Sequence, residues 1–269
     1  SNDGYGQCLR FDCTSQCDDT TNDDVFNYDG SEPPCCTRVL RDMAQIFDKV
    51  MCRTLGLEYF SSYGMLLGLV RDDRIIPWTA DNDYVVSFAV AEEMYKYRSA
   101  FAEEGITLFF DEYYRICASP DFMDGSLARR WTTNNLWKKW AYYPANFPYG
   151  DIFMGEVKPD GHFVDERGCA FPVDKMRPVI RKAVYNKSFS VSVPNQFEDV
   201  ISGTFGMDWR IPDASKTVHG RTLCDSNKKK PKEEVRNKKK SRTWERVWND
   251  VLKDDFYNSA LKKADHIIT

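Results

Sequence analysis

The chain has 269 residues, of which 42% are hydrophobic and 14% aromatic, so it can bury one substantial core. Its 37 basic and 41 acidic side chains give a formal net charge of −4, which argues against a general attraction to nucleic acid or to an anionic membrane. No uninterrupted apolar run approaches the roughly 20 residues of a membrane-spanning helix. Because the sequence begins at Ser1 without a methionine, we expect a luminal or extracellular portion whose targeting segment or anchor is missing.

The cysteines are concentrated near the N-terminus. Six of the nine fall in the first 52 residues: Cys8, Cys13, Cys17, Cys35, Cys36 and Cys52. Residues 1–35 form an acidic, cysteine-rich arm without a core of its own, and this pattern favours disulfide bonds made in an oxidising compartment. A structural Zn²⁺ site built from some of the thiolates is the alternative. The N-glycosylation sequence at 186–188 is compatible with the secretory pathway.

The first regular elements follow the arm. Residues 36–55 carry apolar side chains at three- and four-residue spacing, which predicts an amphipathic helix. Gly56 ends this helix, and residues 57–60 predict a strand that runs into a glycine turn at Gly64. The peptide after Gly64 should open a second helix, whose free N–H groups favour an anion. Arg71 lies later on this helix, where it can contact a phosphate or form a structural ion pair.

Two carboxylates then stand at the start of a β-branched run. Asp81 and Asp83 precede residues 84–86, which predict a strand. Side chains at i and i+2 on an extended segment point to the same face, so both carboxylates can coordinate one hard cation. Acidic residues beside Asn and Thr are also common turn formers, and the pair alone does not establish a metal site. The glycine turn, apolar helix and Ile-Pro-Trp corner before the pair support the metal interpretation.

The remaining segments alternate helices and strands. Residues 90–104 predict a helix, and 106–110 with 113–117 predict paired strands. The aromatic-rich segment 131–149 favours packing in a core or between domains over a sugar-binding platform. An apolar strand carrying a single acidic residue, Asp151, follows at 149–153. Residues 227–243 form a basic stretch, which is typical of a solvated loop but can also attract a polyanionic acceptor or a nucleotide. Residues 244–269 predict an amphipathic C-terminal helix that packs back on the domain that precedes the basic stretch.

The motif Gly-Met-Leu-Leu-Gly-Leu-Val-Arg at 64–71, followed by Ile-Pro-Trp at 76–78 and Asp-Asn-Asp at 81–83, resembles the core of the LicD and fukutin-related family, a branch of the nucleotidyltransferase fold. Residues 168–212 match the family's later run of a Phe-Pro strand, a hairpin, a Val-Pro-Asn turn and a helix, so the resemblance covers about 36–213. Two departures stand out. Met65 replaces a small hydroxyl residue, and Thr79 with Ala80 occupies positions that are often acidic.

The resemblance implies an α+β fold, with a nucleotidyltransferase-like mixed sheet flanked by helices over residues 36–226, behind the cysteine-rich arm. It implies that Asp81, Asp83 and Asp151 are the catalytic residues and the ligands of Mg²⁺ or Mn²⁺. Asp151 is included because the family's third carboxylate arrives from a strand in which Asp is followed by Ile or Phe. The residues that would contact the donor phosphates are Gly64, Met65 and Arg71.

The same resemblance implies a reaction and its partners. A nucleoside diphosphate-linked donor, with CDP-linked donors favoured, would give phosphocholine, a polyol phosphate or a sugar phosphate to a glycan acceptor on a glycoprotein or glycolipid. We expect the secretory lumen, in particular the Golgi, or the extracellular space, no nucleic-acid partner, and membrane attachment only through the missing anchor. Three alternatives stay open: a catalytically inactive member that binds glycans or acts as a chaperone-like subunit, a cysteine-stapled binding module, and a glycosyltransferase that uses Asp-x-Asp.

Overall fold

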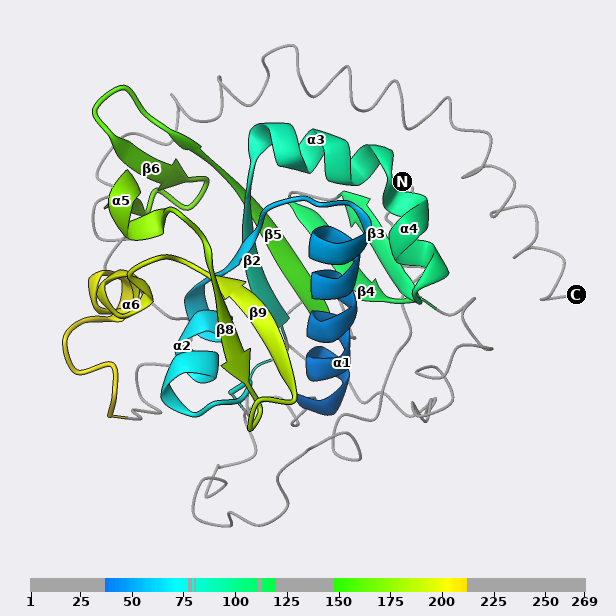
Figure 1. The fold of residues 1–269 in the computed structure, drawn as a ribbon, viewed down its shortest axis with the longest axis horizontal. Coiled ribbons are helices and arrows are strands. Elements are labelled where there is room, and N and C mark those ends of the chain that lie inside the picture. Colours follow the sequence, from blue (N-terminus) through cyan, green and yellow to red (C-terminus); the bar gives the residue numbers. More distant parts are fainter. Residues whose placement is uncertain (1–36, 77–78, 80, 111–112, 120–147, 212–269) are drawn as a thin grey trace, which may run out of the picture. The chain divides into compact units, whose positions relative to one another are not determined.

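The computed structural model describes residues 37–76, 79, 81–110, 113–119 and 148–211, which Figure 1 draws as coloured ribbon. The cysteine-rich arm, most of the aromatic-rich segment, the basic loop and the C-terminal helix expected from the sequence lie outside the described residues. The domain boundaries therefore stay predictions. Among the described helices, none is both long and apolar enough to cross a membrane.

Seven strands form the central sheet of the described part. They are β1 (Phe60–Ser61), β2 (Asp81–Ser87), β3 (Ile106–Phe110), β4 (Tyr114–Ala118), β5 (Tyr149–Val157), β6 (His162–Asp165) and β7 (Ala170–Pro172). The strand order is β1-β2-β5-β4-β3, and β6 pairs with both β5 and β7. Only β2 and β5 run parallel; the other neighbours in this sheet are antiparallel. The mixed sheet with flanking helices that the family resemblance implied is confirmed (Figure 1).

The helices and a separate hairpin surround this sheet. The helices are α1 (Thr37–Asp48), its π-helical continuation η4 (Lys49–Thr54), α2 (Tyr63–Arg71), α3 (Phe88–Lys96), α4 (Arg98–Glu103), α5 (Val173–Met176) and α6 (Phe197–Phe205). The hairpin consists of β8 (Ile180–Val184) and β9 (Phe189–Val193). Two predicted elements differ in detail. The helix expected over 90–104 is divided at Tyr97, and the strand expected over 57–60 is found at 60–61.

One face of the sheet is covered by α1, α3 and α4 through aromatic packing. The ring of Phe47 on α1 lies 4.1 Å from that of Tyr84 on β2 and 5.9 Å from that of Phe101 on α4. Gly150 of β5 lies under this layer, where an added β-carbon would stand 2.8 Å from a side-chain carbon of Ile116 and 3.0 Å from the ring of Tyr84. Such distances are too short for a side chain, so the layer requires glycine at this position.

The alternation of side chains along β2 sends its carboxylates to the opposite face. The Asn82 side chain donates to the carbonyl of Leu40 on α1 at 2.8 Å, and Tyr84 packs on α1. Side chains of a strand alternate between the two faces, so Asp81 and Asp83 point away from α1. Helix α2, which contacts β2, begins on that second face.

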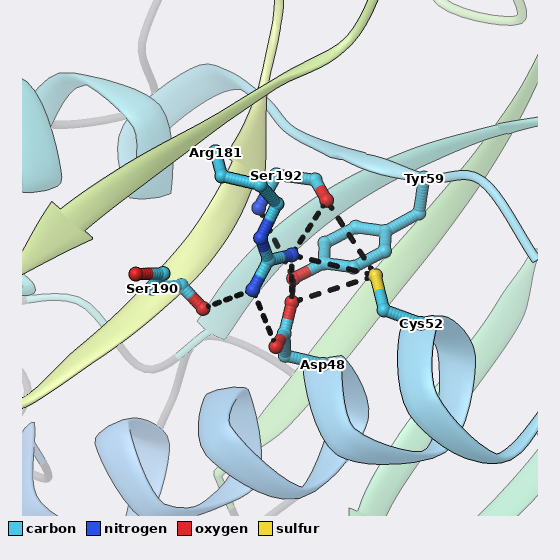
Figure 2. A network of polar contacts seen from close by, with 6 residues as sticks. All are labelled: Asp48, Cys52, Tyr59, Arg181, Ser190 and Ser192. Atoms are coloured by element: carbon cyan, nitrogen blue, oxygen red, sulfur yellow. Dashed lines mark hydrogen bonds and ion pairs between the residues drawn. The ribbon is translucent and has the colours of Figure 1, made fainter. Parts of the chain in front are cut away.

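The β8–β9 hairpin is fastened to α1 by a buried carboxylate, as Figure 2 shows. Nη2 of Arg181 on β8 lies 2.7 Å from Oδ2 of Asp48, and Nη1 contacts the other carboxylate oxygen. Nη1 also donates to the hydroxyl of Ser192 on β9 at 2.8 Å. The hydroxyl of Tyr59 donates to Asp48 at 2.6 Å. Cys52 is a free thiol at the edge of this network, and burial raises the pKa of the thiol.

Candidate metal centre

Three carboxylates converge on the second face of the sheet. In the parallel β2–β5 pair, Asp83 lies opposite Asp151, and Asp81 lies opposite Tyr149. Because Asp81 and Asp83 are two residues apart on one strand, all three aspartates share this face. One carboxylate oxygen from each lies within 4.8 Å of the other two. The structure thus brings together the three residues that sequence analysis singled out as metal ligands; their roles stay predictions.

The chemistry of this triad fits a hard divalent cation. Oxygen ligands at 2.0–2.6 Å from an ion lie at most about 5 Å apart, and carboxylate oxygens suit Mg²⁺, Mn²⁺ and Ca²⁺. Burial raises the pKa of Asp83 well above its usual range, and repulsion from Asp81 and Asp151 raises it further. A bound cation would remove this repulsion, because it is the largest local charge in such a site.

Asp151 is held by an arginine that sequence analysis did not select. Arg115 on β4 lies opposite Asp151 in the antiparallel pair, and its Nε donates to Oδ1 of Asp151 at 2.6 Å. The Arg115 side chain is only 6% exposed, and its guanidinium carbon is 5.4 Å from the centre of the Tyr149 ring. Burial raises the pKa of Asp151 to about 6, while Arg115 opposes the rise. In the sequence, the one signal that could have pointed to Arg115 was its charge within an otherwise apolar predicted strand.

The two aspartates of β2 are oriented by the segments on either side of them. The carboxylate of Asp83 accepts a hydrogen bond from the backbone N–H of Met65, and a β-carbon on Gly64 would lie 3.5 Å from its Oδ2. The hydroxyl of Thr79 donates to Oδ1 of Asp81 at 2.5 Å. Burial raises the pKa of Asp81, and the Thr79 hydrogen bond lowers it. Thr79, one of the two departures from the family's acidic run, therefore fixes a carboxylate of the triad.

Arg71 lies at the other end of α2 from the triad. It is seven residues after Gly64, or roughly 10 Å along the helix axis at 1.5 Å per residue. Its guanidinium makes three hydrogen bonds of 2.7–3.0 Å to Asp72, and its side chain is 8% exposed. The structure thus brings Gly64 and Met65 to the triad and leaves Arg71 in a local ion pair. Gly68 serves packing, since a β-carbon there would stand 2.7 Å from the carbonyl oxygen of Arg74.

A second basic residue near the triad also escaped sequence analysis. Arg167 follows β6, and its guanidinium carbon lies 4.4 Å from the centre of the Tyr63 ring. The Tyr63 hydroxyl donates to the carboxylate of Asp165. In the sequence, residues 165–168 resemble an ordinary polar turn, so no local signal distinguished Arg167.

Comparison with known proteins identifies the family of the chain. The family described as LicD/FKTN/FKRP, nucleotidyltransferase domain, matches residues 56–196, more than half of the chain. The protein named ribitol 5-phosphate transferase FKRP from Mus musculus is 26% identical over 186 residues, which is 68% of this chain and 34% of that protein. Its Homo sapiens counterpart is 26% identical over 211 residues, 75% of this chain and 39% of that protein.

The chain spans less than two fifths of the length of these curated relatives. The family match includes the α2 motif and all three aspartates of the triad. It confirms the resemblance found in the sequence. The chain belongs to the LicD/FKTN/FKRP nucleotidyltransferase-domain family.

Proposed function

We propose that this protein is a metal-dependent phosphotransferase. It moves a phospho-substituted group, such as a polyol phosphate, phosphocholine or a sugar phosphate, from a nucleoside diphosphate-linked donor to a glycan acceptor. The observation that carries the proposal is the convergence of Asp81, Asp83 and Asp151 on neighbouring parallel strands. The relatives named as ribitol 5-phosphate transferases support a polyol phosphate as the transferred group. A CDP-linked donor, which the family resemblance favours, is the first to test.

In this proposal the carboxylates of Asp81 and Asp83 would bind Mg²⁺ or Mn²⁺. The ion would neutralise charge on the donor phosphates and on the departing nucleotide, which is the main requirement of phosphoryl transfer. Thr79 and the Met65 amide fix the two carboxylates before the donor arrives. Such preorganisation avoids rearrangement during the reaction.

Asp151 completes the ligand set or accepts the proton of the acceptor hydroxyl. Arg115 fixes its orientation in either role. The oxygen of the acceptor hydroxyl forms a bond to the transferred phosphorus. The bond from this phosphorus to the bridging oxygen breaks, and the nucleoside monophosphate leaves with that oxygen and its electron pair.

The intact triad favours this function over an inactive, glycan-binding role. The inactive alternative depended on the thinned acidic run at 79–80, yet Thr79 supports Asp81 directly. A luminal or extracellular location, with the Golgi as the first candidate, belongs to the same proposal. Residues 186–188, which carry the N-glycosylation sequence, are exposed in the β8–β9 turn, and this supports the proposed location.

The test is nucleotide release by the full chain. CDP-, UDP- and GDP-linked donors are incubated with Mn²⁺, Mg²⁺ or EDTA, and the nucleoside monophosphate formed is measured by chromatography, with and without glycan acceptors. Release from one donor class that requires metal and is lost in Asp83→Asn would support the proposal. Asp160→Asn, an exposed turn aspartate outside the triad, is the matched control and should keep activity. Metal-independent release, or equal release by Asp83→Asn, would contradict the proposal.

A further inference from the structure

We propose that Arg167 binds the phosphates of the donor, next to the acidic triad. This inference rests on the proposed function and adds a residue to its site. Neither the sequence motif nor the expected set of Gly64, Met65 and Arg71 includes Arg167.

The sheet brings Arg167 to the face that carries the triad. Asp151, Phe153 and Gly155 alternate along β5 and therefore share that face. Gly155 pairs with Asp165, the last residue of β6, so the turn that follows begins on the same face. The guanidinium carbon of Arg167 is 5.5 Å from the centre of the Phe153 ring. Phe153 lies two residues, or roughly 7 Å, from Asp151 along the strand.

The turn that holds Arg167 is fixed by several hydrogen bonds. The carboxylate of Asp165 accepts from the backbone N–H of Cys169 at 3.0 Å and from the backbone N–H of Arg167 itself. Glu166 is bonded twice to Met154 on β5, through its own N–H at 2.9 Å and through its carboxylate at 3.0 Å. The backbone of Arg167 is therefore anchored on both sides.

The Tyr63 ring supports the Arg167 side chain. Its centre is 4.4 Å from the guanidinium carbon, within the range of a cation–π contact. The ring is held by its hydroxyl bond to Asp165 and by edge-to-face packing on Phe153 at 5.4 Å. Tyr63 has a φ of +44°, in the left-handed region that non-glycine residues rarely adopt. Strain of this kind is concentrated at functional sites.

The charge of Arg167 reaches the whole triad. Burial raises the pKa of Asp81, Asp83 and Asp151, and the positive charge of Arg167 opposes that rise at all three. A divalent ion would offset the excess of carboxylates over arginines at this site, so an anionic diphosphate could approach Arg167. Arginine suits this role because its planar fork matches phosphate oxygens.

The experiment measures metal binding and phosphate binding separately on the full chain. Isothermal titration calorimetry determines the affinity for Mn²⁺ alone, and then for CDP, inorganic pyrophosphate and cytidine at saturating Mn²⁺. The variants are Arg167→Gln and Arg167→Lys. The matched control is Arg210→Gln, because Arg210 also lies over an aromatic ring, 4.2 Å from the centre of Trp209, and pairs with Glu198.

We expect Arg167→Gln to weaken CDP and pyrophosphate binding about tenfold or more, since charge-assisted hydrogen bonds are lost. Its Mn²⁺ affinity should be unchanged or higher, because a positive neighbour has been removed. Arg167→Lys should bind CDP and pyrophosphate with an affinity between those of the parent protein and Arg167→Gln. Arg210→Gln should bind them as the parent protein does. A purely structural role would weaken Mn²⁺ and CDP binding together, and that result would overturn the inference.

The two proposals fail in different ways. If the parent protein binds CDP or pyrophosphate with Mn²⁺ and Arg167→Gln binds them equally well, the Arg167 inference is wrong and the proposed function stands. If the parent protein binds neither ligand with Mn²⁺, the donor site of the proposed function is wrong and the Arg167 inference falls with it.

Discussion

In the metal-free protein, replacing Asp151 by Asn should stabilise the fold at pH 8 and change little at pH 4. The pKa of this carboxyl is raised from 3.8 to about 6, chiefly by burial. Between these two values the folded protein binds a proton that the unfolded chain does not. The free energy of unfolding therefore falls by about 1.4 kcal/mol per pH unit as the pH rises from 3.8 to about 6. The full loss, reached above pH 6, is about 3 kcal/mol.

Asparagine imitates the neutral carboxyl, so Asp151→Asn should recover much of this loss. The gain corresponds to roughly 5–10 °C in melting temperature for a domain of this size. The assay is thermal or urea unfolding in EDTA from pH 4 to pH 8, with Asp199→Asn as the control. Asp199 is half exposed and paired with Lys175, so its replacement should change the free energy of unfolding by no more than about 1 kcal/mol.

Adding Mn²⁺ to the parent protein at pH 7.5 should restore stability, by about 2.7 kcal/mol at a concentration one hundred times the dissociation constant. Asp151→Asn should gain less because it lacks one carboxylate. The opposite result is informative. If Asp151→Asn is less stable than the parent at pH 8, the ion pair with Arg115 outweighs the burial of charge, and the reasoning is wrong.

Two further predictions concern interactions outside the triad. Arg181→Met should lower the free energy of unfolding by roughly 3–5 kcal/mol in chemical unfolding, because it leaves the buried charge of Asp48 without its cation. Asp48→Asn removes that charge and should lower the free energy of unfolding by less. Equal losses in the two variants would contradict this reasoning. Gly68→Ala should destabilise the protein by roughly 1–3 kcal/mol, since its β-carbon would meet the Arg74 carbonyl. Gly64→Ala on the same helix should be neutral or stabilising, because its β-carbon would make only an ordinary contact. Similar melting temperatures for the two variants would count against the packing argument.

The elements that depend on local pattern were predictable. The apolar spacing over residues 36–55 predicted the first helix, and the paired strands at 106–110 and 113–117 match β3 and β4 closely. The change to π-helix at Lys49 and the break at Tyr97 were not predictable, because neither site carries a proline or glycine.

The same distinction between local patterns and long-range contacts applies to the residues of the candidate site. Asp81 and Asp83 were found by their i, i+2 spacing, while Asp151 was assigned through the family resemblance, since its position beside Asp83 depends on the parallel β2–β5 register. Arg115 and Arg167 were missed because they reach the triad through pairings of β5 with β4 and β6 that no local pattern determines.

The electrostatics of the triad fit the proposed cation site better than a structural ion-pair cluster. Aspartates that stabilise a fold through arginine partners have a lowered pKa. Here the pKa of each aspartate is raised despite Arg115 and Arg167, so the three charges oppose folding in the absence of a cation. A fold that keeps such an arrangement gives up stability for function, which is common at active sites. The cost is smallest when a divalent ion is bound, and this is the state that the proposed reaction uses.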